Sequence, residues 1–289
     1  MNGGVPCDVG RLAAALAATL WLVLSVAPAA AEPLRIVSLA PNLTEMLFAA
    51  GAGGQVVGAS AYSDWPPPAR QLPRVGDAFR LDYEGILALR PDLAVAWRSG
   101  TPAEAVARLE RAGIRVVVLE VQSLEEIADG IETLGRVAGT GPVAAAAARR
   151  FRSEVERLRA GHTGQPDLDV FIELDHRPLF TVSGRHLISE MVSICGGRNV
   201  FEPLPGLAPA VDIEAVIAAR PDVILYTGPD PDPAALWKAW PDVPAVRDGN
   251  VLPIAGDLVS RATPRVVAGI EAICMALDGA RARRPQPRG

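Results

Sequence analysis

The pattern of apolar and polar positions repeats once along the chain. Residues 81–97 read LDYEGILALRPDLAVAW, and residues 211–227 read VDIEAVIAARPDVILYT. In both, an aspartate suited to an N-cap precedes a short stretch with helical apolar spacing, and an Arg-Pro-Asp then stops the helix. The continuous apolar run that follows is short and bounded by turns, which is typical of a strand buried on both faces. Each segment therefore predicts a helix followed by a buried strand.

The flanking segments also repeat. Residues 35–54 and 178–197 each predict a strand, a loop and a helix, and residues 113–135 and 249–277 do the same. Between the halves, residues 141–161 are rich in alanine and arginine, which predicts one long helix. A flexible linker is the alternative, but it would need Gly, Ser or Pro, which this stretch nearly lacks.

Strands that alternate with helices over short links predict parallel sheets covered by helices. The fold class is therefore α/β: two Rossmann-like lobes with mostly parallel sheets, joined by a single long backbone helix. We expect an N-terminal lobe over 32–140, the linking helix over 141–161, a C-terminal lobe over 162–278 and a disordered tail over 279–289. A connection made of one helix predicts only a small closure of the lobes.

The N-terminus has the pattern of a secretory signal over residues 1–31. Arg11 precedes an apolar run, Pro28 breaks it, and three alanines before Glu32 fit a cleavage site. An uncleaved anchor is the alternative, because the apolar run is long for a signal. We expect export to the periplasm with cleavage of the signal.

Composition and charge exclude several classes of function. The net charge of −5 argues against a nucleic-acid partner, which would favour a basic surface. His162, His176 and His186 show no metal-ligand spacing, although His176 could reach a metal in a ligand if it is not simply a solvated loop residue. The chain contains no GxSxG, HExxH or P-loop string. We therefore expect a protein that is not an enzyme and has no metal or cofactor of its own.

Signal cleavage would remove Cys7 and leave Cys195 and Cys274. In an oxidising compartment these two can pair in only one way, and two buried free thiols are the alternative. The disulfide would close a loop of about 80 residues, worth about 4–5 kcal/mol on the chain-entropy model.

Ligands of parallel sheets bind beside the carboxyl ends of the strands and at interfaces between lobes. The segments that follow predicted strands are 59–70 (ASAYSDWPPPAR), 97–102, 175–180 and 256–265. The first contains Tyr62 and Trp65, although only 5% of the chain is aromatic. We therefore expect these loops to line a ligand cleft. For Trp65 the alternative is that it only packs within its own loop.

Several stretches resemble one known family. RIVSLAPNLTEMLFAAG, YSDWPP, LRPDLAVAW, CGGRNVF and the repeated ARPD-strand are similar to periplasmic substrate-binding proteins with a helical backbone. Members deliver vitamin B12, haem or ferric siderophores to ABC importers. The resemblance spans about Arg35 to Leu277, and YSDWPP with GDLVSRATPR is most like the vitamin B12 (cobalamin) branch.

The resemblance implies roles for individual residues. Tyr62 and Trp97 would pack on a corrin ring, and Asp257 with Arg261 would meet its polar fringe. Further ligand-binding candidates are Phe180, Phe79 and Arg98. Glu84 and Glu214 lie in the first turns of equivalent helices and would dock onto arginines of a membrane permease. The alternative is that the helix dipole alone stabilises each carboxylate there. The same resemblance implies a disulfide between Cys195 and Cys274.

At two positions the chain departs from the resemblance. Ala78 and Ala208 stand where the best-studied B12 receptors have tryptophans, and only Ala78 has an aromatic neighbour, Phe79. The expected function is capture of cobalamin or a related corrinoid by a monomer that delivers it to the ABC permease and its ATPase. The alternatives are a haem or ferric-siderophore receptor, and a cell-envelope enzyme or chelatase-like protein on the same fold.

Overall fold

The computed structural model describes residues 1, 3–4, 33–228, 232 and 234–284, and the predicted signal lies almost wholly outside them. From Leu34 onward the chain forms one compact unit. Among the described residues, no helix has the length and apolar character that crossing a membrane requires.

The N-terminal lobe contains a parallel four-stranded sheet in the order β2-β1-β3-β4. Its strands are β1 (Ile36–Ser38), β2 (Val56–Ala59), β3 (Leu93–Trp97) and β4 (Arg115–Leu119). Its helices are α2 (Pro41–Ala49), α3 (Tyr83–Ala88), α4 (Ala103–Arg111) and α5 (Leu124–Ala138), with 3-10 turns η1 (Gly53–Gln55) and η2 (Pro67–Gln71). The central strands β1 and β3 are buried almost throughout, as their continuous apolar runs predict.

The C-terminal lobe repeats this arrangement with a parallel sheet in the order β10-β9-β5-β8. Its strands are β5 (Leu168–Glu173), β8 (Gly197–Asn199), β9 (Val223–Tyr226) and β10 (Val251–Pro253), and β6 (Asp175–His176) pairs with β7 (Leu179–Phe180) as a separate antiparallel ribbon. Its helices are α7 (Leu187–Ile194), α8 (Ile213–Ala219), α9 (Ala234–Trp237), α10 (Pro244–Arg247), α11 (Gly256–Val259) and α12 (Val266–Arg283). The tail predicted from residue 279 is therefore wrong as far as Arg283, because α12 continues to that residue.

The internal repeat is reproduced at the level of single residues. Asp82 accepts a hydrogen bond from Gly85 N at 3.0 Å and caps α3, and Asp212 accepts one from Ala215 N at 2.8 Å and caps α8. After these helices, Arg90 and Arg220 both adopt positive φ angles, of 45° and 49°. The left-handed residue and the following proline end both helices, so each chain segment turns directly into the next strand.

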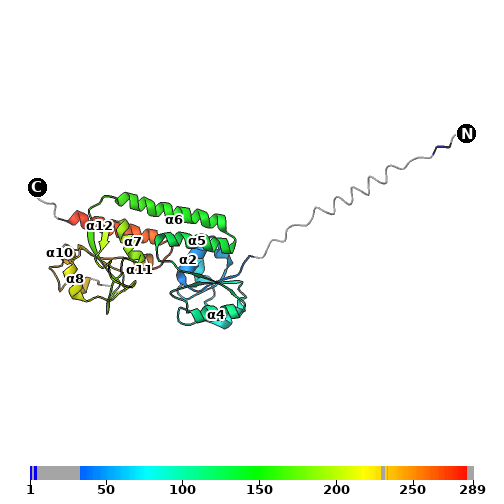
Figure 1. The fold of residues 1–289 in the computed structure, drawn as a ribbon, viewed down its shortest axis with the longest axis horizontal. Coiled ribbons are helices and arrows are strands. Elements are labelled where there is room, and N and C mark those ends of the chain that lie inside the picture. Colours follow the sequence, from blue (N-terminus) through cyan, green and yellow to red (C-terminus); the bar gives the residue numbers. More distant parts are fainter. Residues whose placement is uncertain (2, 5–32, 229–231, 233, 285–289) are drawn as a thin grey trace. The chain divides into compact units, whose positions relative to one another are not determined.

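The helix α6 (Gly141–His162) links the lobes, and it packs on α5 of one lobe and on α7 and α12 of the other (Figure 1). Its buried face has helical spacing and consists of Ala144, Ala148, Phe151, Val155 and Leu158. Gly135 allows the close approach of α5, because a Cβ there would collide with the Cβ of Ala144. On the outer side, Arg152 donates to Glu125, Asp129 and Glu132 of α5 at 2.6–2.8 Å.

One hydrophobic cluster extends from the first sheet through α6 to the second sheet. It contains Ile36 of β1, Phe151 of α6 and Leu168 of β5. The lobes are also joined where Glu190 of α7 accepts a hydrogen bond from Leu124 N, at the start of α5, at 2.9 Å. This shared core holds the two lobes more rigidly than a loop connection would.

Candidate functional site

The four loops predicted to line a cleft follow the carboxyl ends of parallel strands in the structure. Segment 59–70 follows β2, 97–102 follows β3, 175–180 follows β5, and 256–265 follows β10. Residues of both lobes enclose a pocket of about 140 Å³, called here the interlobe pocket. It is lined by Trp97, Ser99, Val121, Gln122, Arg185, His186, Leu187, Leu207, Ser260 and Ala262.

Trp97 is the predicted site residue that lines this pocket. It is the last residue of β3, and its backbone N–H donates to Thr101 Oγ1 at 3.2 Å, which fixes the turn that follows the strand. Its side chain is half-buried and packs on the shared core. The indole therefore presents a fixed apolar surface to the space between the lobes.

Tyr62 is exposed and held in an unfavourable backbone conformation. Its φ angle is 63°, in the left-handed region that residues other than glycine rarely adopt, and 77% of its surface is accessible. Such a conformation costs on the order of 1–3 kcal/mol and is typical of ligand sites. The loop is fixed beneath it, because the buried Ser63 hydroxyl bonds the Thr44 hydroxyl at 3.0 Å and the Ser60 hydroxyl at 3.2 Å.

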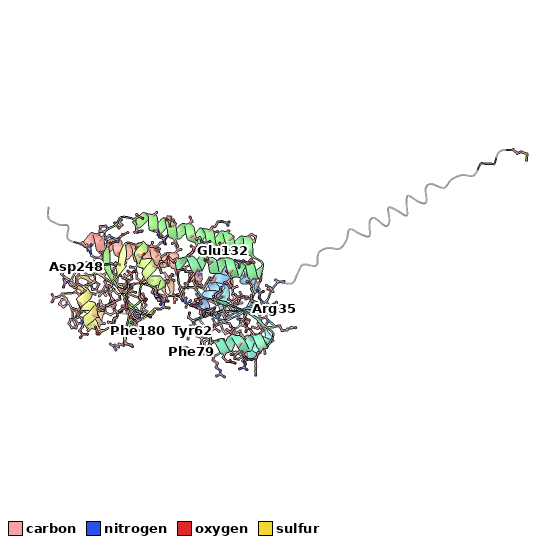
Figure 2. All side chains as sticks on the ribbon, in the orientation of Figure 1. Arg35, Tyr62, Phe79, Glu132, Phe180 and Asp248 are labelled. Carbon is pink, nitrogen blue, oxygen red and sulfur yellow. A yellow bond between two sulfur atoms is a disulfide. The ribbon has the colours of Figure 1, made fainter. Side chains whose placement is uncertain are left out.

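Phe79 lies on a neighbouring turn of the same lobe, and 97% of its surface is accessible (Figure 2). Asp77 shapes this turn, because its Oδ1 accepts from the backbone N–H groups of Phe79 and Arg80 at 2.8 Å. The bond from the Arg80 N–H, and to a smaller extent that from the Phe79 N–H, lowers the pKa of Asp77 and keeps it ionised. The turn is tied to the Tyr62 loop by the bond from Ala61 N to Gly76 O at 2.7 Å.

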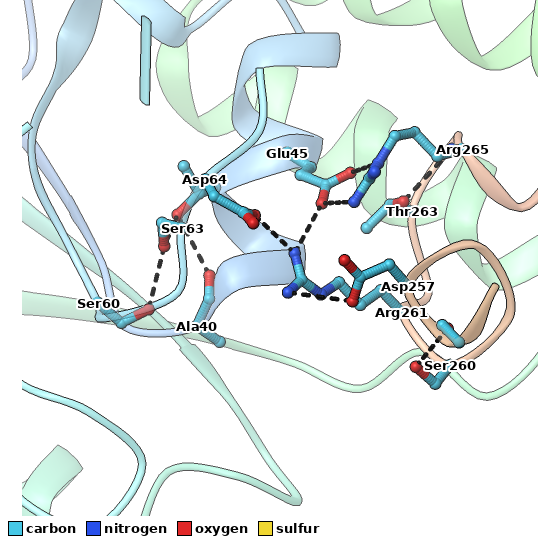
Figure 3. A network of polar contacts seen from close by, with 12 residues as sticks. Ala40, Glu45, Ser60, Ser63, Asp64, Asp257, Ser260, Arg261, Thr263 and Arg265 are labelled. Atoms are coloured by element: carbon cyan, nitrogen blue, oxygen red, sulfur yellow. Dashed lines mark hydrogen bonds and ion pairs between the residues drawn. The ribbon is translucent and has the colours of Figure 1, made fainter. Parts of the chain in front are cut away.

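Arg261 contacts carboxylates of both lobes. Its guanidinium lies 3.4 Å from Asp257, but it donates to Asp64 of the N-terminal lobe at 2.9 Å and lies 3.5 Å from Glu45 (Figure 3). Arg265 donates to both carboxylate oxygens of Glu45, at 2.7 and 2.8 Å. This interlobe ion cluster, formed by Glu45, Asp64, Asp257, Arg261 and Arg265, joins the lobes through Asp64 of the Tyr62 loop and Glu45 of α2.

The charges of the cluster reinforce one another. The bond from Arg261 lowers the pKa of the Asp64 carboxyl, and the bond to Glu45 raises the pKa of Arg265. Glu45 is buried, so its charge depends on the two arginines for compensation. Sequence reasoning missed Glu45, Asp64 and Arg265, because a glutamate within an apolar helix and a half-buried aspartate in a loop carry no signal of their distant partners.

The remaining ligand candidates are less directed toward the pocket. Arg98 is exposed and forms an ion pair with Glu120 at 3.1 Å. Phe180 is half-buried in the small ribbon of the C-terminal lobe (Figure 2). His176 lies 3.5 Å from the buried Glu173, which also accepts a bond from the Trp237 indole at 2.7 Å. Within the described residues, no group of three or more His, Cys, Asp or Glu is placed to hold a metal ion.

The two positions that depart from the resemblance, Ala78 and Ala208, are both exposed. Phe79 stands beside the first, as the sequence shows. Beside the second, Leu207 lines the interlobe pocket and is 39% exposed. An aliphatic side chain therefore lies next to Ala208 at the pocket.

Glu84 and Glu214 occupy the first turns of α3 and α8, and both are exposed. Neither has an ion-pair partner among the described residues. The disulfide between Cys195 and Cys274 is confirmed, and it joins the C-terminal end of α7 to α12 across a sequence separation of 79.

Comparison with known proteins agrees with this geometry. A protein family described as periplasmic binding protein matches residues 36–257. A Vitamin B12-binding protein of Vibrio vulnificus is 34% identical over 257 residues, which cover 89% of this chain and 94% of the relative. One of Vibrio cholerae is 36% identical over 241 residues, covering 83% of this chain and 87% of the relative.

Solved structures give the same result for the fold. The periplasmic Vitamin B12 binding protein BtuF of Vibrio cholerae has a TM-score of 0.78 at 35% identity, covering 86% of this chain and 98% of its own. The periplasmic heme-binding protein RhuT of Roseiflexus sp. RS-1 has a TM-score of 0.75 at 26% identity, covering 86% and 99%. The match over most of the chain, with two parallel-sheet lobes on a single helix, shows that this chain belongs to the periplasmic binding protein family.

Proposed function

We propose that this protein is the periplasmic binding component of an ABC importer and captures cobalamin or a related corrinoid between its lobes. The observation that carries the proposal is the similarity to relatives named for vitamin B12 binding, which extends over 83–89% of this chain and includes both lobes. Members of the family are binding proteins, so we assign capture rather than catalysis to the site.

The aromatic side chains of the N-terminal lobe suit a corrin ring. A corrinoid offers a broad apolar face, and burial of apolar surface is worth about 25 cal/mol per Å². Tyr62 and Phe79 project from loops that their own hydrogen bonds hold in place, and Trp97 lies at the pocket itself. Loop backbone that is fixed before the ligand arrives loses little conformational entropy on binding, which favours high affinity.

A haem receptor is the second candidate, and the similarity to RhuT supports it. A haem would also use the aromatic loops, but its iron usually requires an axial side-chain ligand. Tyr62 and His176 are the residues on these loops that could supply one. The choice between the two ligands is therefore a question for direct binding measurements.

Calorimetric titration of the purified protein with cyanocobalamin, cobinamide, haemin and a ferric siderophore tests the assignment. We expect one corrinoid molecule to bind per chain, with higher affinity for corrinoids than for haemin or the siderophore. Tight binding of haemin with no corrinoid binding would replace the first candidate with the second. Chemical turnover of any of these ligands would instead favour an enzyme.

The delivery step requires contact with a membrane permease and its ATPase. We propose that Glu84 and Glu214 dock on that partner, since they begin equivalent helices of the two lobes and remain exposed. Charge complementarity of this kind mainly sets orientation and association rate. We further propose that a monomer acts in the periplasm after cleavage of the signal at residues 1–31.

A further inference from the structure

The interlobe pocket is too small for a flat ring system and has a polar wall. Its volume of about 140 Å³ is well below the roughly 300–1,000 Å³ of pockets that enclose whole drug-sized ligands. Ser99 and Gln122 of the N-terminal lobe face Arg185, His186 and Ser260 of the other lobe across it. The pocket therefore fits one polar substituent of a ligand whose ring lies outside it.

The charge of this pocket is positive and uncompensated. Arg185 is exposed, and its guanidinium has no hydrogen-bond or ion-pair partner in the described part of the chain. No carboxylate is among the pocket-lining residues. By contrast, Arg98 and Arg261, on the neighbouring loops, are paired with Glu120 and with the interlobe ion cluster. Arg185 is thus the pocket-lining cation that is available to an anionic ligand group.

His186, which also lines the pocket, adds a hydrogen-bond donor to its wall. As the N-cap of α7, its Nδ1 accepts a bond from Ile188 N at 3.2 Å. A nitrogen that accepts carries no proton, so the proton of the neutral ring is on Nε2, at the opposite edge. Burial lowers the pKa of His186 and so favours the neutral ring, whose tautomer is set by the bond from Ile188 N.

We propose that Arg185, assisted by His186, binds the anionic substituent of the transported ligand and is a specificity-determining residue of the cleft. The inference rests on the proposed function, and for cobalamin the group is the phosphodiester of the nucleotide loop. A guanidinium matches a phosphate with two parallel N–H donors, whereas a neutral amide rim gains less from it. The ring face packs on the aromatic loops while the phosphodiester enters the pocket.

Two ligands and two variants test this assignment. Cobinamide has the corrin ring but lacks the phosphodiester, so wild-type protein should bind cyanocobalamin more tightly than cobinamide. In Arg185→Gln, the affinity for cyanocobalamin should fall about tenfold, as expected for loss of a charge-assisted pair, and that for cobinamide should change less than about twofold. Arg150→Gln removes the same charge from an exposed position on α6 and should change neither affinity.

The outcomes separate the inference from the function on which it rests. Equal losses for both corrinoids in Arg185→Gln, or no loss for either, would overturn the role of Arg185 while leaving corrinoid capture intact. If wild-type protein binds neither corrinoid, the proposed function fails and the assignment fails with it. Arg185→Lys keeps the charge without the paired donors, so it should give an affinity for cyanocobalamin between those of wild type and Arg185→Gln.

Discussion

Glu45 and Arg265 lie 220 positions apart in the sequence and form a two-bonded ion pair between the lobes, at 2.7 and 2.8 Å. The carboxylate side chain of Glu45 is only 3% exposed, and Arg261 approaches the same carboxylate at 3.5 Å. A buried carboxylate is stable only while its partners remain, so this contact opposes separation of the lobes.

Glu45→Gln should destabilise the protein by about 3 kcal/mol, because it leaves Arg265 without its charge partner in a partly buried position. The measurement is the free energy of unfolding in urea. Glu154→Gln breaks an exposed pair with Arg157 on α6 and should cost less than about 1 kcal/mol. If the two variants lose similar stability, the cluster does not hold the lobes.

Tyr62→Asn should raise the stability of the folded protein and lower its affinity for the ligand. Asparagine tolerates the left-handed conformation better than tyrosine, so the folded protein should gain up to about 1 kcal/mol. Removal of the ring should weaken cyanocobalamin binding by more than about 1 kcal/mol, as should Tyr62→Ala. Tyr62→Phe keeps the ring and should retain most of the affinity. Unchanged affinity in Tyr62→Ala would reject ring contact at this residue.

His186 should make stability depend on pH. Burial lowers its pKa in the folded protein, so as pH falls below the ordinary value of 6.5 the unfolded chain binds a proton that the folded chain does not. Stability should therefore fall as the solution becomes more acidic than about pH 6.5. His186→Asn retains an N-cap acceptor without titrating, and its melting temperature should decrease less between pH 7.5 and 5. A decrease equal to that of wild type would contradict the prediction.

The double variant Glu84→Ala/Glu214→Ala should bind corrinoid normally and fail in uptake, because both charges are exposed and neither residue lines the interlobe pocket. Corrinoid-dependent growth of cells that carry only the variant measures uptake. Glu104→Ala/Glu156→Ala removes two other exposed carboxylates and should support normal growth. Normal uptake in the first double variant would show that the two glutamates are not needed for docking.

Much of the fold could be predicted from the sequence, because the elements repeat and carry their own start and stop signals. Asp82 and Asp212 cap their helices, Pro91 and Pro221 follow the helix ends, and the apolar runs become central strands. The predicted tail begins before the end of α12, because the last turns of this helix are arginine-rich and polar. Arg281 nevertheless donates to the carbonyls of Cys195 and Gly196, at 2.7 and 2.9 Å, and so holds that end of the helix.

The candidate site was only partly predictable, for a physical reason. Trp97 and Tyr62 could be placed because loops that follow parallel strands share one edge of a sheet. The sequence could not predict the roles of Glu45, Arg265 and Arg185. Whether each of these side chains has a partner depends on how the two lobes pack. Pairing across the lobes gives Arg261 a structural contact besides its predicted role. It leaves Arg185 as the unpaired cation of the pocket within the described residues.

The most direct test of corrinoid capture is a pair of crystal structures, one of the free protein and one of its complex with cyanocobalamin. We predict that the corrin ring lies between the lobes against Tyr62 and Trp97, with the phosphodiester at Arg185, and that the lobes rotate only slightly because α6 and the interlobe ion cluster join them. A corrinoid bound elsewhere, or a rotation of tens of degrees between the two structures, would contradict this account.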